Sequence, residues 1–177
     1  MSCALTKGRI VPCKNKSGSI KTVYFADFGT LGAITESAGL ISAFGGTPTW
    51  YQYDVRGTTN LDTVVTSSRE NGTTFYTQTL TLQLQYYDRA TSEELKLLAV
   101  GRPHIVVVDA DDNFLLVGKV NGGELTTGNF TVGANMGDFN GFNLTFEALE
   151  TAPPDFVTST VITGGTIGTQ INTFPTS

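Results

Sequence analysis

The run from Thr73 to Gln85 constrains the fold more than any other feature of the chain. Leucines at 80, 82 and 84 alternate with polar residues, and this period of two indicates a β-strand with one apolar and one polar face. The polar face is predicted to carry hydroxyls and amides but no charge, at Thr77, Thr79, Thr81, Gln83 and Gln85. The pair Asn71-Gly72 separates this run from a second alternating segment, 60–68, which predicts a long antiparallel hairpin.

Further strand signals follow at intervals along the chain, separated by Gly, Asn and Asp. They predict strands near 10–11, 21–28, 50–56, 104–109, 114–120, 125–132 and 141–149. Val106, Val107 and Val108 form an uninterrupted apolar run, so their strand is expected to be buried on both faces. The fold class predicted is mainly β, an antiparallel β-barrel or sandwich.

One helix is expected at about 91–100. Thr91 and Glu94 have the spacing of a capping box, and Gly101 is a candidate for a left-handed helix stop. About nine residues is too short for an independent helix, so this one is expected to pack on the sheet.

Two segments lack clear periodicity. Residues 29–49 are rich in Gly, Ala and Ser and predict a long loop. Residues 155–177, which follow Pro153-Pro154, are rich in Thr, Gly and Ser and predict an extended C-terminal arm. The predicted organisation is therefore one β domain over 1–154, including the loop, and an arm over 155–177.

Charge is scarce in this chain, and this bears on its partners. Charged residues make up 15% of the sequence, against roughly 25% in a typical globular domain, so part of the surface is expected to be covered by other copies of the chain. The net charge of −5 argues against a nucleic-acid grip, which needs clustered cations. No signal-peptide pattern and no apolar run long enough to span a bilayer occur, so synthesis in a cytoplasm and no membrane span are expected.

Motifs for chemistry are weak throughout. His104 is the only histidine and is interpreted as a structural residue at the start of a strand. A Ser-His-Asp triad and most zinc sites are therefore not expected. The acidic run 109–113 fails the calcium-loop spacing, because Phe114 stands where Gly is needed and Val120 where Glu is needed. Glu147 and Glu150 are not linked to any cleft, and no phosphate-binding glycine pattern is present. We therefore expect a structural protein without a cofactor or metal, not an enzyme.

Two stretches carry a resemblance to a known family. In 94–108, a Leu-rich helix end is followed by Arg-Pro-His and a run of valines. The second stretch, 133–146, is rich in Gly, Asn and Phe. Together with the order of the predicted elements, they resemble the tail-tube proteins of tailed bacterial viruses, a family that contractile injection systems share. The resemblance covers about residues 1–155. It implies a virion protein made in the host cytoplasm, six copies of which close into a ring, with rings stacking into a tube through which DNA passes without specific binding.

The family architecture also implies roles for the segments above. The strand 73–85 becomes a wall strand, so its polar face is the candidate inter-subunit or lumen surface. The loop and the arm become ring-stacking elements, with candidate contact residues Phe44, Trp50, Phe156, Ile162, Ile167 and Ile171. The implied partners are copies of the chain and other tail or connector proteins of the virion.

Two other functions remain open at this point. A head-tail connector or tail-completion ring would use much the same fold without forming stacks. A carbohydrate-binding β-sandwich would need an exposed aromatic platform, which Trp50, Tyr51, Tyr53, Tyr86 and Tyr87 could supply.

Overall fold

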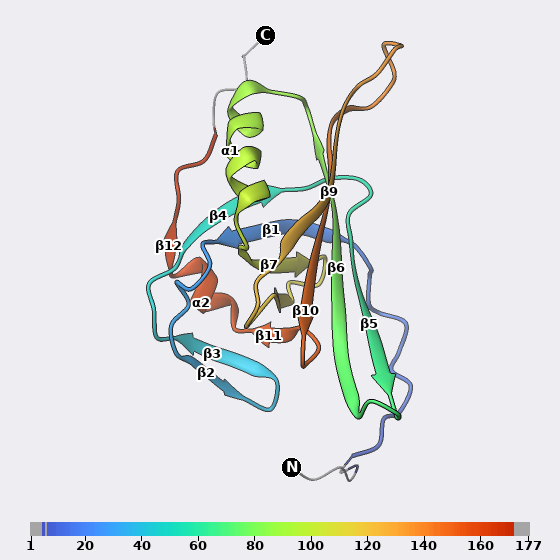
Figure 1. The fold of residues 1–177 in the computed structure, drawn as a ribbon, viewed down its shortest axis with the longest axis vertical. Coiled ribbons are helices and arrows are strands. Elements are labelled where there is room, and N and C mark those ends of the chain that lie inside the picture. Colours follow the sequence, from blue (N-terminus) through green and yellow to red (C-terminus); the bar gives the residue numbers. More distant parts are fainter. Residues whose placement is uncertain (1–4, 6, 172–177) are drawn as a thin grey trace.

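The computed structural model describes residue 5 and residues 7–171 (Figure 1). Its strands are β1 (Ile20–Ala26), β2 (Ile34–Ser37), β3 (Leu40–Phe44), β4 (Thr49–Asp54), β5 (Asn60–Ser68), β6 (Thr73–Gln85), β7 (His104–Asp109), β8 (Phe114–Val117), β9 (Glu124–Val132), β10 (Asn140–Glu150), β11 (Asp155–Val157) and β12 (Thr166–Ile167). Its helices are α1 (Arg89–Val100) and the short α2 (Ser159–Thr163). None of the helices in these described residues is long and apolar enough to cross a membrane.

The strands form two sheets that pack as a sandwich. The large sheet has the order β12-β4-β1-β7-β8-β11-β3-β2, and the small sheet has the order β5-β6-β10-β9. The small sheet is antiparallel throughout, and its long strands extend beyond the body of the molecule at both ends (Figure 1). The predicted mainly β fold with a short helix is therefore confirmed in its sandwich form, because the described strands do not close into a barrel.

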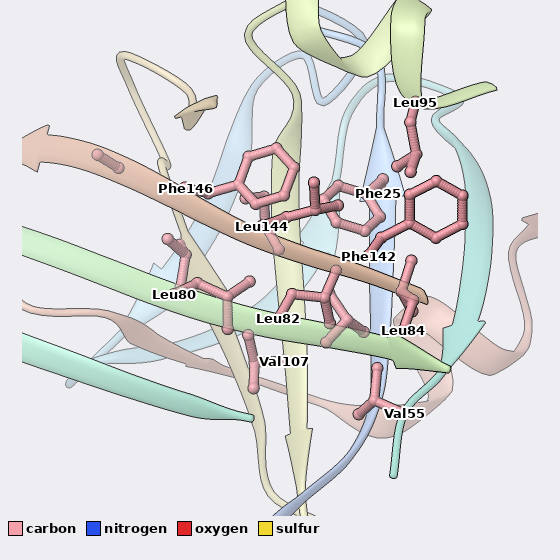
Figure 2. Packing of buried hydrophobic residues seen from close by; sticks show 14 residues of the cluster. Phe25, Val55, Leu80, Leu82, Leu84, Leu95, Val107, Phe142, Leu144 and Phe146 are labelled. Carbon is pink, nitrogen blue, oxygen red and sulfur yellow. The ribbon is translucent and has the colours of Figure 1, made fainter. Parts of the chain in front are cut away.

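The first hydrophobic core lies between the two sheets. Leu80, Leu82 and Leu84 of β6 point into it, as the alternation in the sequence predicts. Phe142, Leu144 and Phe146 of β10 lie beside them, and Figure 2 shows the two rows together with Phe25 and Val107 of the large sheet. Leu95 extends from α1 toward this cluster, so the helix is held at one end of the sandwich (Figure 2).

A second core lies on the other side of the large sheet. Trp50 is completely buried there with Ile41 and Ile162, and β7 contributes Val106 and Val108. Ile105 and Val107 of the same strand face the first core, so β7 is buried on both faces as its valine run predicts.

The ends of α1 differ from the sequence prediction. Asp88, not Thr91, is the N-cap, and its carboxylate accepts a hydrogen bond of 2.9 Å from the Thr91 backbone N–H. An aspartate at this position satisfies one of the free N–H groups of the first turn, so the helix begins at Arg89. Gly101 ends the helix in an extended conformation (φ −83°, ψ 175°), not in the expected left-handed one.

The predicted long loop over 29–49 contains a β-hairpin. β2 and β3 pair in it around Ala38 (φ 52°) and Gly39 (φ 78°). Two consecutive residues with positive φ form the kind of tight turn that matches the twist of a hairpin. The hairpin joins the edge of the large sheet through β3, which runs parallel to β11.

Both terminal segments also differ from expectation. The described part of the predicted arm, 155–171, adds β11 to β8 and β12 to β4, while its Val157 and Ile162 are buried in the second core. Residues 172–177 of that arm, and residues 1–4 and 6 of the predicted domain, lie outside the described residues. The strand expected near 10–11 is absent: residues 7–19 contain no strand and are exposed throughout.

Candidate functional site

The outward side of the small sheet, called here the open face, is the first candidate surface. Thr77, Thr79, Thr81 and Gln83 are half-buried on it and Gln85 is exposed, so the predicted polar strand face is brought together on one surface. Neighbouring strands continue its chemistry. Thr81 lies between Asn60 of β5 and Thr145 of β10, and Gln83 lies beside Asn143, which pairs in turn with Asn129.

A row of carboxylates crosses the open face. Thr79 of β6 pairs with Asp62 of β5 on one side and with Glu147 of β10 on the other. Glu147 pairs directly with Glu124 of β9. Like charges directly opposite each other on a sheet are destabilising. None of the four strands contains Lys, Arg or His, and none of the ion pairs among the described residues involves these three acids.

The row of carboxylates was not predicted from the sequence. The signal was present, because Asp62, Glu124 and Glu147 each stand at an outward position of an alternating strand. Only the register across four strands, however, aligns them in one row. One predicted face residue also binds the backbone of the subunit, since the Gln83 side-chain oxygen accepts a hydrogen bond of 3.2 Å from the Thr58 N–H.

The predicted ring-stacking residues do not gather on one surface. Trp50 and Ile162 are completely buried, and Phe44 packs against Trp50 with ring centroids 5.8 Å apart. These three side chains therefore belong to the second core of the subunit. Phe156 and Ile167 are exposed, with Ile167 next to Trp50 in the β12–β4 register. Ile171 lines the groove described below.

The N-terminal segment, residues 7–19, is a second candidate surface. It carries Lys7, Arg9, Lys14 and Lys16 and no acidic residue. Lys16 forms an ion pair of 3.6 Å with Asp111 in the turn between β7 and β8, which anchors the base of the segment. Beyond this point Ile10 and Val11 are 89% and 95% exposed. No ion pair within the described part of the chain involves the other three cations.

A groove of about 750 Å³ between α1, β4 and the residues after β12 is the third candidate. Three carboxylates line it, and Lys, Arg and His are absent from its lining. They are Asp54 at the end of β4, Asp88 at the cap of α1, and Glu94 on α1. Burial, together with the negative charge of Glu94, raises the pKa of Tyr53 in the same lining to about 12, so its hydroxyl keeps its proton.

Of the predicted aromatic platform, three tyrosines line this groove: Tyr51, Tyr53 and Tyr86. Trp50 is not available to it, because that ring is buried on the opposite side of β4. Tyr87 is outside the lining and stacks on Phe142, with ring centroids 5.1 Å apart.

The only histidine has structural partners. His104 Nε2 accepts a hydrogen bond of 3.1 Å from the Gly29 N–H, so Nδ1 carries the proton and donates to the Gly118 carbonyl at 2.6 Å. Gln78 accepts from the Gly118 N–H at 3.1 Å, and this network ties β6 of the small sheet to the end of β8. Burial lowers the pKa of His104, which keeps the ring neutral near pH 7.

The acidic run 109–113 is a turn motif in the structure. Both carboxylate oxygens of Asp109 accept hydrogen bonds from Asn113, and one also accepts from the Asp111 N–H. These bonds lower the pKa of Asp109 even though burial opposes the shift. Among the described residues, no group of three or more His, Cys, Asp or Glu side chains is placed to hold a metal ion.

Comparisons with protein-family models, curated proteins and solved structures find no match for the chain.

Proposed function

We propose that this chain is a structural subunit of a virion tail, which assembles with copies of itself into rings that stack into a tube for DNA. The open face of the small sheet is the observation that supports this proposal most strongly. Its four strands present amides, hydroxyls and a row of carboxylates and contain no cation, and Val64 and Leu149 flank Thr77 on the same face.

Such a face suits the wall of a DNA conduit. Cations on a wall bind phosphate and release counterions, which holds DNA in place. The row through Asp62, Glu147 and Glu124 instead repels phosphate, and repeating it around a ring adds a band of negative potential. Because paired acids weaken a sheet, their presence is easier to explain by a role outside the subunit than by folding.

The edges of the small sheet suggest how a ring closes. β5 and β9 are both edge strands, and Val64, Val65, Phe130 and Val132 on them are at least half exposed. Long apolar edges of this kind pair with other chains unless they are covered. Strand directions alternate across the sheet, so β9 of one copy and β5 of the next would pair antiparallel. This contact is heterologous and forms a ring when its rotation closes.

The first test is assembly of the purified chain, followed by sedimentation velocity and negative-stain electron microscopy. We expect rings with an open centre and stacks of them. Single rings that never stack would assign the chain to a head-tail connector or tail-completion ring. A monomer at all concentrations would refute both assignments.

The second test addresses the lumen. Glu147→Lys places a cation on the open face, and rings of this variant are expected to retain double-stranded DNA, with retention falling as salt is raised. Glu93→Lys makes the same charge change on α1, where Glu93 pairs with Lys96 at the surface, and serves as the matched control. Equal DNA retention by the two variants would show that the open face does not line the conduit.

The groove supports one other candidate function, carbohydrate binding. Tyr51, Tyr53 and Tyr86 line it together with carboxylates and amides, which is the mixture that a sugar ring contacts. Binding of a defined glycan to the monomer, lost in Tyr51→Ala, would favour that function over the tube. A tube subunit is expected to bind none of the glycans in a panel.

A further inference from the structure

The N-terminal segment and the groove beside α1 are complementary in charge. Residues 7–19 carry four cations and no acid, whereas the groove is lined by three carboxylates and no cation. Complementary potentials of this kind steer two surfaces together and exclude wrong partners. Of the groove carboxylates, Glu94 is exposed and has no ion pair among the described residues, so it is free to accept a cation from another molecule.

The two surfaces also match in their apolar parts. Ile10 and Val11 stand almost fully exposed between Arg9 and Lys14 in the segment. Leu97 lines the groove together with Tyr51 and Tyr53 and is 69% exposed. Covering such apolar surface stabilises a contact. The cationic and aliphatic side chains of the segment are therefore complementary to the carboxylates and apolar rings of the groove.

Position within the subunit decides which copy supplies each surface. Figure 1 shows the N-terminal segment running from the middle of the molecule toward one end of its longest axis, and α1, which borders the groove, toward the other end. Thirteen residues in a fully extended conformation reach at most about 45 Å. When copies stack head to tail along this axis, the segment of one copy meets the groove of the next. A head-to-tail contact of this kind does not close on itself, so it repeats along a stack.

We propose that residues 7–19 of each copy bind in the groove between α1 and β4 of the copy stacked on it, and that this contact holds successive rings together. The proposal rests on the proposed function, because it assumes that rings stack. It assigns stacking to the N-terminal segment and ring closure to the edges of the small sheet, so the two contacts fail separately.

The first experiment needs no ring. A synthetic peptide of residues 7–19, with Cys13→Ser to prevent oxidation, is titrated into the full chain by calorimetry. We expect binding that weakens as salt is raised, because the contact is ionic at an exposed surface. Glu94→Lys is expected to lower the affinity by about tenfold or more, and the matched Glu93→Lys by less than about twofold. Absence of binding, or equal affinity for the two variants, would overturn the proposal.

The second experiment uses a charge swap in the full chain. Glu94→Lys alone, and Arg9→Glu with Lys14→Glu alone, are expected to leave rings that do not stack under the electron microscope. Combining the three substitutions is expected to restore stacks, because opposite charges again face each other. Stacks of normal length in either partial variant would overturn the proposal.

The outcomes separate this inference from the proposed function. Rings that stack without the segment would leave the tube intact and remove only the proposed docking. Peptide binding by a chain that never forms rings would support the docking while the tube proposal fails. Peptide binding that appears only after residues 172–177 are deleted would assign the groove to the end of the chain itself and overturn the docking between copies.

Discussion

The two sheets of this molecule are used in different ways. The central strand of the large sheet, β7, is buried on both faces, and cores lie on either side of it. The small sheet buries one face only, and its other face is open across all four strands. Every residue of β7 from His104 to Val108 is therefore constrained by packing. Along β6 and β10 only every second residue is constrained by packing. The residues between them can be selected for contacts outside the subunit.

The largest predicted effect contrasts two neighbours on β10. Phe146 is completely buried in the first core and contacts Phe25, with ring centroids 5.2 Å apart. Phe146→Ala is expected to lower the free energy of unfolding by about 3–5 kcal/mol. Thr145→Ala, on the open face, is expected to change it by less than about 0.5 kcal/mol. Urea unfolding followed by circular dichroism measures both, and similar costs would contradict the contrast between the two faces.

Much of this contrast could be predicted from the sequence. The alternation in 73–85 correctly assigned the leucines of β6 to the core and the polar residues between them to the open face, and the valine run correctly indicated a strand buried on both sides. Both signals are local, because they depend only on the period of one strand. The carboxylate row is not local, since Asp62, Glu147 and Glu124 meet only through the register of separate strands.

The terminal segments show where local patterns fail. Ile162 stands in a Thr- and Gly-rich stretch that resembles an arm, but it is buried against the second core that contains Trp50. Ile10 and Val11 resemble the start of a strand, but in the described residues no strand pairs with them. The presence of a distant packing partner decides the outcome for Ile162 and its absence decides the outcome for Ile10 and Val11, and a window of sequence contains no information about such partners.

A second prediction contrasts two glutamates of β10. The Glu150 carboxylate is buried and accepts hydrogen bonds of 2.9 and 2.8 Å from the backbone N–H groups of Val120 and Asn121. Glu150→Gln weakens charge-assisted bonds and is expected to cost about 1–3 kcal/mol. Glu147→Gln removes one of two facing acids on the open face and is expected to be neutral or slightly stabilising. Thermal unfolding of both variants at pH 7 checks this, and a larger loss for Glu147→Gln would contradict it.

A third prediction concerns acid. Burial lowers the pKa of His104 below its ordinary 6.5, so the unfolded chain binds this proton more readily than the folded one. The contribution of neutral His104 to the free energy of unfolding is therefore fully present above about pH 6.5. It is lost as pH decreases from there toward the folded-state pKa. Because His104 is the only histidine, His104→Asn is expected to remove the pH dependence of the melting temperature in this window. An unchanged slope in the variant would show that another group is responsible.

The smallest predicted effect concerns the open face itself. Thr79 lies between Asp62 and Glu147 in the carboxylate row, so Thr79→Lys places a cation between two acids. Opposite charges across strands contribute about 0.2–1 kcal/mol, so this variant is expected to unfold at a slightly higher temperature, and Thr79→Glu at a lower one. The chain nevertheless has threonine, not lysine, at position 79. If Thr79→Lys is indeed more stable as a subunit but retains DNA as an assembly, the open face is maintained for passage of a polyanion at the expense of stability. If Thr79→Lys destabilises the subunit, the row is not the repulsive surface that its register indicates, and the argument for a conduit loses its main support.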